Sequence, residues 1–105
     1  MDKYTYRVTW SEEDREYVAL CAEFPSLSWL DSNQGKALKG IAKLVSEVLI
    51  EMQDSGGSPP APISTKKFTG KFMVRITPDM HRDLAIAAAE QKVSLNRLVS
   101  SRLAR

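Results

Sequence analysis

The sequence has 105 residues, 43% of them hydrophobic, and a formal net charge of +2. This length allows one ordinary domain or two very small ones, and the hydrophobic content excludes a disordered polyelectrolyte. Cys21 is the only cysteine, which excludes an intrachain disulfide and a zinc knuckle. The polar N-terminus has no hydrophobic signal core and no stretch is apolar enough to span a membrane, so we expect a cytoplasmic protein.

The middle of the chain separates two halves of different pattern. Residues 55–62 read Ser-Gly-Gly-Ser-Pro-Pro-Ala-Pro, and such a composition loosens the chain and blocks helix formation. We therefore predict a first domain over residues 1–54, a linker over 55–69 and a second domain over 70–105. A long loop within one domain is the alternative, but the change of pattern on either side favours the linker.

The first half has the pattern of a small sheet followed by a helix. Residues 4–10 and 17–24 are rich in aromatic and β-branched residues around a short polar connector, which predicts a β-hairpin. Residues 25–30 fit either a third short strand or a loop. Apolar residues then recur at helical spacing at Leu38, Ile41, Ala42, Val45, Val48, Leu49 and Met52. One helix packed on a small antiparallel sheet, an α+β arrangement, buries both apolar faces.

The second half has one strand pattern and two helix patterns. Residues 71–77 predict a strand, in which the apolar Phe72, Val74 and Ile76 point one way and Lys71, Met73 and Arg75 point the other. Thr77 and Ser94 are placed to cap two successive helices, the first of which ends near residue 91. The positions expected to be buried in the first helix are Met80, Leu84, Ala87 and Ala88, and the apolar stripe of the second is Leu95, Leu98, Val99 and Leu103.

One strand and two short helices cannot close a core, because both edges of a lone strand stay unpaired. The simplest remedy is a symmetric dimer that pairs two copies of the strand antiparallel and covers one face of this ribbon with four helices. The predicted dimerisation core consists of Phe72, Val74, Ile76, Leu84, Leu95, Leu98 and Val99.

The other face of the ribbon predicts a DNA interface. A two-stranded ribbon fits the major groove, where Lys71 and Arg75 can donate to guanine and Met73 can contact thymine methyl groups. The residues expected to contact phosphates are Ser94, Asn96, Lys66, Lys67 and Arg97. Residues 63–105 hold nine basic and three acidic residues, whereas residues 1–62 hold six basic and ten acidic ones. The small net charge therefore hides a basic half suited to DNA.

Two stretches of the second half resemble a known family. Residues 70–84, Gly-Lys-Phe-Met-Val-Arg-Ile-Thr-Pro-Asp-Met-His-Arg-Asp-Leu, and residues 93–99, Val-Ser-Leu-Asn-Arg-Leu-Val, resemble a ribbon-helix-helix domain. More narrowly, they resemble the C-terminal domain of HicB-type antitoxins. Residues 6–11, 17–19 and 24–28 are similar to the N-terminal HicB-like domain, so the resemblance extends over nearly the whole chain.

The resemblance implies an antitoxin of a type II toxin–antitoxin system. It implies an N-domain with a partial ribonuclease-H-like fold that binds and blocks HicA, an mRNA-cleaving ribonuclease toxin. It also implies a C-domain that dimerises, binds operator DNA and represses the operon, without enzymatic activity or a cofactor. Association of two such dimers, through the N-domains or along DNA, would give a tetramer. The alternative function is a ribbon-helix-helix repressor with a ligand-sensing N-domain and no toxin partner.

One segment departs from the family pattern. Family members often begin the N-domain helix with Thr-Pro-Glu-Glu-Ala, where this chain has Asn-Gln-Gly-Lys-Ala at residues 33–37. Asn33 is a good cap, but Gly35 is a poor helix former and Lys36 places a positive charge near the positive end of the helix dipole. We therefore expect a frayed first turn in an otherwise unchanged fold.

Other residues of the first half have both a functional and a structural interpretation. The candidates for binding a basic toxin are Glu12, Glu13, Asp14, Glu16 and Trp29. A solvated hairpin turn and a tryptophan in the core are the corresponding alternatives. We expect Trp10 to complete the core and Cys21 to be a packed strand residue.

Chemistry at a catalytic or metal site is not predicted. The carboxylates closest to the strand patterns are Asp14, Glu16, Glu23 and Asp31, and nothing in their spacing requires the convergence that a two-metal nuclease needs. The only histidine, His81, is expected on the surface of the first helix of the second domain, away from Cys21. We therefore predict no catalytic residue and no metal ligand.

Overall fold

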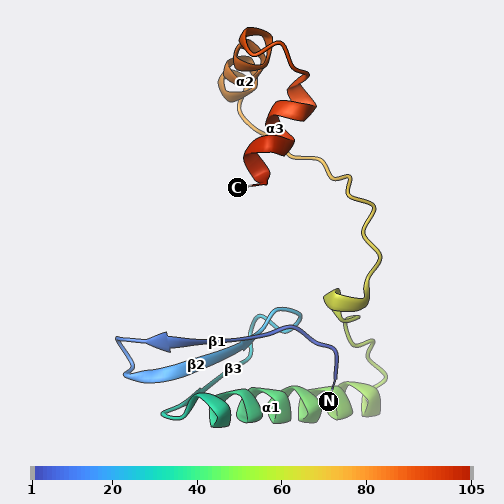
Figure 1. Cartoon of the computed structure of the whole chain (residues 1–105). Helices are drawn as coiled ribbons and strands as arrows, with labels where there is room; N and C mark the ends of the chain where they lie inside the picture. Colours follow the sequence, from blue (N-terminus) through green and yellow to red (C-terminus); the bar gives the residue numbers. More distant parts are fainter. Residues whose placement is uncertain (1, 105) are drawn as a thin grey trace. The chain divides into compact units, whose positions relative to one another are not determined.

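The computed structural model describes residues 2–104 and divides the chain into two compact units, residues 1–68 and residues 69–105, the N-terminal unit and the C-terminal unit (Figure 1). Within the described residues, three strands, a long helix and a short 3-10 helix, η1 (Ile63–Thr65), form the N-terminal unit, and two further helices follow in the C-terminal unit. This order confirms an α+β protein. Within residues 2–104, no helix combines the length and the apolar character that crossing a membrane requires.

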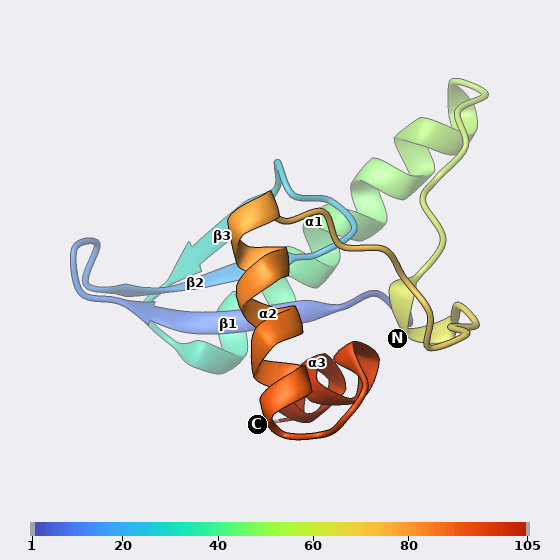
Figure 2. The same cartoon turned by 90° about the horizontal axis from the view of Figure 1, so that it is seen from above.

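The predicted hairpin is confirmed in the N-terminal unit. Strands β1 (Tyr6–Ser11) and β2 (Glu16–Cys21) pair antiparallel, with Tyr6 opposite Cys21. Strand β3 (Ser28–Asp31) pairs antiparallel with β2, which settles the open choice between a strand and a loop. The sheet order is β1–β2–β3, so β2 is the central strand and β1 and β3 are the edges (Figure 2).

Helix α1 (Gln34–Asp54) lies along one face of this sheet in both views (Figures 1 and 2). The apolar spacing along the helix places Ala37, Ile41 and Val45 on one side, where all three are buried. They share a core with the buried Ala19 and Cys21 of β2 and with other apolar side chains of the sheet. Burying a side chain the size of Ile41 or Val45 stabilises the fold by about 1.5–3 kcal/mol.

The first turn of α1 is formed, and the frayed turn expected from the sequence is not observed. The Asn33 side chain accepts a hydrogen bond of 2.9 Å from the backbone N–H of Lys36, and Asp31 accepts one of 2.8 Å from the N–H of Asn33. The first bond satisfies a backbone N–H group of the first helical turn, and the second holds the capping residue Asn33 in place. Together they compensate for Gly35 and for the lack of an acidic residue in the first turn.

Helix α1 ends in a Schellman motif. Gly56 adopts φ +78°, a conformation that favours glycine, and the N–H of Gly57 donates to the carbonyl oxygen of Met52 at 2.8 Å. The motif ends the helix where the predicted linker begins.

Residues 60–64, within that predicted linker, are hydrogen-bonded to the start of the chain. The Tyr4 hydroxyl donates to the Pro60 carbonyl oxygen at 2.7 Å, and the Ser64 hydroxyl donates to the Lys3 carbonyl oxygen at 2.6 Å. Part of the predicted linker is therefore not free, because these bonds hold residues 60–64 against the N-terminal unit.

Two capped helices form the C-terminal unit: α2 (Pro78–Glu90) and α3 (Leu95–Leu103). Both predicted caps are confirmed. The Thr77 hydroxyl oxygen accepts from the N–H of Met80 at 3.2 Å, and the Ser94 hydroxyl oxygen accepts from the N–H of Arg97 at 3.0 Å. The helices are therefore specified locally.

The single chain buries few side chains in this unit. Ala88 of α2 and Leu98 of α3 are buried, as predicted. The expected burial of Met80 is wrong for the single chain, because this side chain is 52% exposed. Met80 lies at the start of α2, more than two turns before the buried Ala88.

Candidate functional site

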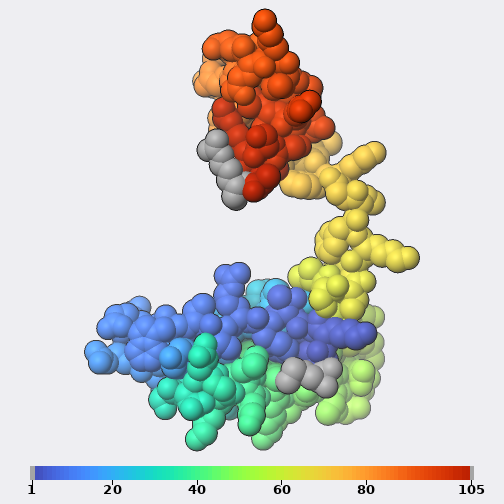
Figure 3. All heavy atoms as spheres, in the orientation of Figure 1, coloured from blue at the N-terminus to red at the C-terminus, as the bar shows by residue number. Residues whose placement is uncertain are grey.

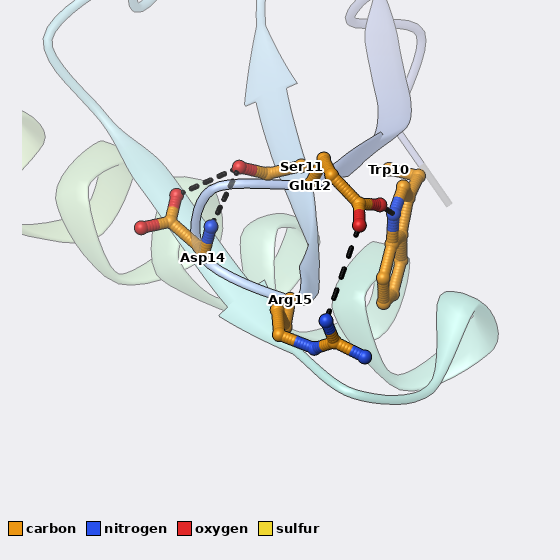
Figure 4. Close-up of polar contacts among 5 residues, drawn as sticks. All are labelled: Trp10, Ser11, Glu12, Asp14 and Arg15. Atoms are coloured by element: carbon orange, nitrogen blue, oxygen red, sulfur yellow. Dashed lines mark hydrogen bonds and ion pairs between the residues drawn. The ribbon is translucent and has the colours of Figure 1, made fainter.

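The acidic turn between β1 and β2 is held by its own side chains (Figure 4). Glu12 accepts a hydrogen bond of 2.7 Å from the Trp10 indole N–H and lies 4.0 Å from the Arg15 guanidinium. Asp14 accepts from the Ser11 hydroxyl at 2.9 Å. Arg15 takes a left-handed conformation with φ +52°, which closes the turn. The exposed carboxylates of Glu12 and Asp14 are therefore presented on an ordered loop.

Trp10 lies beside this turn and not in the core, so its predicted burial is wrong. The side chain is 48% exposed and packs edge-on against Tyr17, with 5.1 Å between the ring centroids. The physical reason is its place on the edge strand β1 near the hairpin turn, which projects beyond the first turn of α1 (Figures 1 and 2). Trp10 thus belongs with the exposed acidic turn.

Trp29 lies between the two interpretations that the sequence allowed. It is 41% exposed, and its indole ring lies directly over Gly40 of α1. A Cβ atom at Gly40 would come within 2.1 Å of the indole nitrogen, so the bare helix backbone is what lets the ring approach. The indole ring therefore packs against α1 on one side, and the exposed part of its surface can still contact a partner.

Glu23 has a structural role that the sequence did not predict. Its carboxylate accepts hydrogen bonds from the N–H of Ile63 at 2.9 Å and from the N–H and hydroxyl of Thr5 at 3.0 and 3.1 Å. Partial burial raises the pKa of this carboxyl, but the bonds from the N–H groups of Ile63, Thr5 and Glu23 itself outweigh it and lower the pKa to about 2. Glu23 therefore remains an anion that holds the chain near Ile63.

Cys21 is buried, as predicted, and burial raises the pKa of its thiol. Its Sγ lies 3.6 Å from a Glu23 carboxylate oxygen. A buried thiol beside an anion lacks the thiolate character that a nucleophile needs.

Every residue of the predicted ribbon segment, residues 71–77, is exposed in the single chain. Phe72 is 77% exposed, and the apolar side chains of Val74 and Ile76 are also exposed. Within the described part of the chain this segment pairs with no strand, and the sheet consists of β1, β2 and β3 alone. The segment thus offers an unpaired backbone and an uncovered apolar face.

These even-numbered side chains line an apolar groove of about 340 Å³ with the facing sides of α2 and α3. We call it the apolar groove; its lining is Phe72, Val74, Ile76, His81, Leu84, Leu95, Val99 and Leu103. Six of the seven residues predicted for the dimerisation core meet here. The seventh, Leu98, is instead buried within the unit. His81 is exposed, as predicted, and its spacing of three residues from Leu84 places it on the groove side of α2.

None of the predicted DNA contacts lines this groove. Met73 and Arg75 are exposed and do not line it. Lys71 and Asn96 line a neighbouring hollow of about 540 Å³. Arg97, Lys66 and Lys67 are also exposed. The hydroxyl oxygen of Ser94 is used as the cap of α3.

Residues 57–103 match the HicB family. This region is a HicB family domain. Comparisons with curated proteins and with solved structures gave no match.

The HicB domain covers both helices of the C-terminal unit and the whole ribbon segment. It contains every residue predicted to contact DNA, including Lys66 and Lys67 at the end of the N-terminal unit. The three-stranded sheet and α1 precede the HicB match, so the candidate toxin-binding residues Glu12 and Trp29 rest on the structure and on the sequence resemblance alone.

Proposed function

We propose that this protein is a HicB-like antitoxin that also represses its own operon. In this proposal the N-terminal unit neutralises a HicA-like, mRNA-cleaving ribonuclease toxin in the cytoplasm, and the C-terminal unit binds operator DNA as a homodimer. The HicB domain over residues 57–103 is the observation that carries the proposal. HicB antitoxins are generally not enzymes, and we assign no catalytic residue and no cofactor.

The apolar groove supports the dimer. Exposed Phe72, Val74 and Ile76 would destabilise a monomer in water, whereas pairing two ribbon segments covers them and satisfies their backbone groups. Burying a Val or Phe side chain contributes about 1.5–3 kcal/mol. A ribbon-helix-helix dimer therefore gains from both copies of the groove at once.

The outward side chains support DNA binding. Lys71, Met73 and Arg75 alternate with the groove residues, so a paired ribbon presents them together on its other face. Two cations and a thioether on a two-stranded ribbon suit base edges in the major groove. Nine basic residues against three acidic ones in residues 63–105 add the attraction to phosphates.

The acidic first half of the chain, residues 1–62, supports a protein partner of basic charge. Residues 1–62 carry ten acidic and six basic residues, and Glu12, Glu13 and Asp14 are exposed on an ordered turn beside the half-exposed Trp10. We propose that this turn, together with Glu16 and Trp29, contacts the toxin and that neutralisation is steric. A partial ribonuclease-H-like fold is our assignment for the sheet and α1.

A paired experiment tests both activities with the full chain. Mobility shifts with the DNA upstream of the gene should show tight binding, and a scrambled duplex should bind weakly. Co-expression should restore growth of cells that express the small basic protein encoded beside it. Operator binding without rescue would favour the ligand-sensing repressor, and absence of both would overturn the proposal.

A further inference from the structure

The outward side of α1 carries charges that are sorted by sign along the helix. Basic residues occupy its first half and acidic residues its second half, at spacings of three or four residues that keep them on one side. We call this set the charge stripe: Lys36, Lys39, Lys43, Glu47, Glu51 and Asp54, all exposed. Within residues 2–104 the ion pairs are Arg15–Glu12 and Arg82–Asp79, so the stripe has no ion-pair partner in the described chain.

This order of charges does not serve the stability of α1 itself. Acidic residues stabilise the start of a helix and basic residues its end, yet α1 has no acidic residue in its first turn and no basic one in its last. Lys43 precedes Glu47 by four residues, the less favourable order for a pair within one helix. Another molecule that is acidic where α1 is basic, and the reverse, would explain the stripe.

We propose that the charge stripe pairs two copies of this chain, with one α1 antiparallel to the other. Residue 45 is the midpoint of Lys36 and Asp54, of Lys39 and Glu51, and of Lys43 and Glu47. A two-fold axis that crosses the exposed side of α1 at the level of residue 45 therefore places every lysine of one copy at the level of an acidic residue of the other. Such a self-complementary surface is what a two-fold interface requires.

An apolar contact accompanies the charges. Ile50 lies on the same side of α1 as the stripe and is 59% exposed. It has the same midpoint with Gly40, so the axis places Ile50 of one copy at the level of Gly40 of the other, where the partly exposed Trp29 ring covers the helix backbone. The space-filling view shows α1, in green, forming an outer surface of the N-terminal unit (Figure 3).

The size of the surface sets the strength of the contact. A helix of 21 residues is about 31 Å long, and one such pair buries less than the ~800 Å² per partner of a stable interface. We therefore expect a weak, salt-sensitive contact that is reinforced where two chains are already joined. That reinforcement rests on the proposed ribbon dimer, whereas the charge matching does not.

Zero-length carbodiimide crosslinking of the full chain tests the proposal. Lys36 and Asp54 are 18 positions apart on one helix, about 27 Å, so a direct crosslink between them can only join two chains. With a mixture of isotopically labelled and unlabelled protein, mass spectrometry should find mixed-label Lys36–Asp54 crosslinks that decrease at high salt. Their absence from the folded wild-type protein would overturn the proposal.

Charge reversal at the centre supplies the control, because it leaves both crosslinked residues in place. Lys43→Glu alone and Glu47→Lys alone should each reduce Lys36–Asp54 crosslinking at least fivefold. A mixture of the two variants should restore it, whereas Lys3→Glu, the same change at an exposed residue outside α1, should leave it unchanged. A Lys36–Asp54 crosslinking yield that these charge reversals leave unchanged would also overturn the proposal. So would a result in which the lysines of α1 crosslink only to a different protein.

Operator binding by the Lys43→Glu variant separates this inference from the proposed function. Unchanged operator binding with lost crosslinking supports the α1 contact and an independent DNA-binding dimer. Crosslinking in wild type without operator binding would leave the α1 contact standing and overturn the proposed repressor.

Discussion

The Glu23 carboxylate accepts a hydrogen bond of 2.9 Å from the backbone N–H of Ile63, forty positions further along the chain. The same carboxylate accepts from the N–H and hydroxyl of Thr5. One half-buried side chain thus joins the end of β2, the start of the chain and the segment that leads into the C-terminal unit. Glu23 fixes where that segment leaves the sheet, just before Lys66 and Lys67.

Loss of the Glu23 carboxylate should destabilise the N-terminal unit in a pH-dependent way. At pH 7 we expect Glu23→Ala to lower the free energy of unfolding by about 1–2 kcal/mol, a value reduced for partial solvent exposure. The folded-state pKa of about 2 lies below the ordinary value of 4.5, so the contribution is complete above pH 4.5 and is lost as the pH falls towards 2. Urea unfolding of wild type and variant at pH 7, 4 and 2.5 should show a narrowing difference.

Glu13→Ala provides the matched control, because Glu13 is exposed in the hairpin turn. It should change the free energy of unfolding by less than about 0.5 kcal/mol. A pH-independent difference between Glu23→Ala and wild type would contradict the role of the charged carboxylate.

A side chain at Gly40 should displace Trp29. The added Cβ of Gly40→Ala would lie 2.1 Å from the indole nitrogen, so we expect a loss of about 1–3 kcal/mol in unfolding free energy and a shifted Trp29 indole N–H resonance. Gly35→Ala is the control, since its Cβ meets only the Asn33 side-chain oxygen, at 3.3 Å. An unshifted indole signal in Gly40→Ala would show that the ring does not rest on the helix.

The parts of the fold that the sequence predicted are those set by neighbouring residues. The β1–β2 hairpin follows from alternation around a polar turn, and Thr77 and Ser94 cap helices through residues three positions away. The apolar groove was also predictable, because a period of two along residues 71–77 and a period near four on the helices assign each side chain to a face.

The parts that were missed depend on contacts distant in sequence. Trp10 has the apolar character of a core residue, and only its place beyond the first turn of α1 explains its exposure. The donor to Glu23 is a backbone N–H, which every residue except proline carries, so no residue pattern marks Ile63 as the partner. Burial of Met80 was predicted from helical spacing, but the single chain supplies no side chain to cover it.

A charge on the groove face should dissociate the proposed dimer. We expect Val74→Asp to convert the chain to a smaller species in light scattering, because pairing would bury an unpartnered carboxylate at a cost of several kcal/mol. Met73→Asp is the adjacent control on the opposite face, where it should keep the mass of wild type and weaken DNA binding. Equal masses for Val74→Asp and wild type over a dilution series would contradict the ribbon dimer.

Removal of the Arg75 side chain should weaken operator binding specifically. A bidentate contact to guanine is worth about 1–3 kcal/mol, so Arg75→Ala should raise the operator Kd by roughly 5- to 150-fold in a mobility-shift titration. Toxin binding should be unchanged. Arg82→Ala, at an arginine that is ion-paired to Asp79 on α2, should have a much smaller effect. Equal operator affinity for Arg75→Ala and wild type would remove Arg75 from the interface.

Lys66 and Lys67 should act through phosphates and not through bases. Replacing both by Ala should lower affinity for operator and scrambled DNA alike and reduce the slope of log K against log salt by about 0.9 for each lost phosphate contact. Because both side chains are exposed on the segment that Glu23 holds at Ile63, Glu23→Ala should produce part of the same change without removing a positive charge. Titrations between 50 and 200 mM salt measure both slopes; a double-alanine slope identical to wild type would show that these lysines are only solvated.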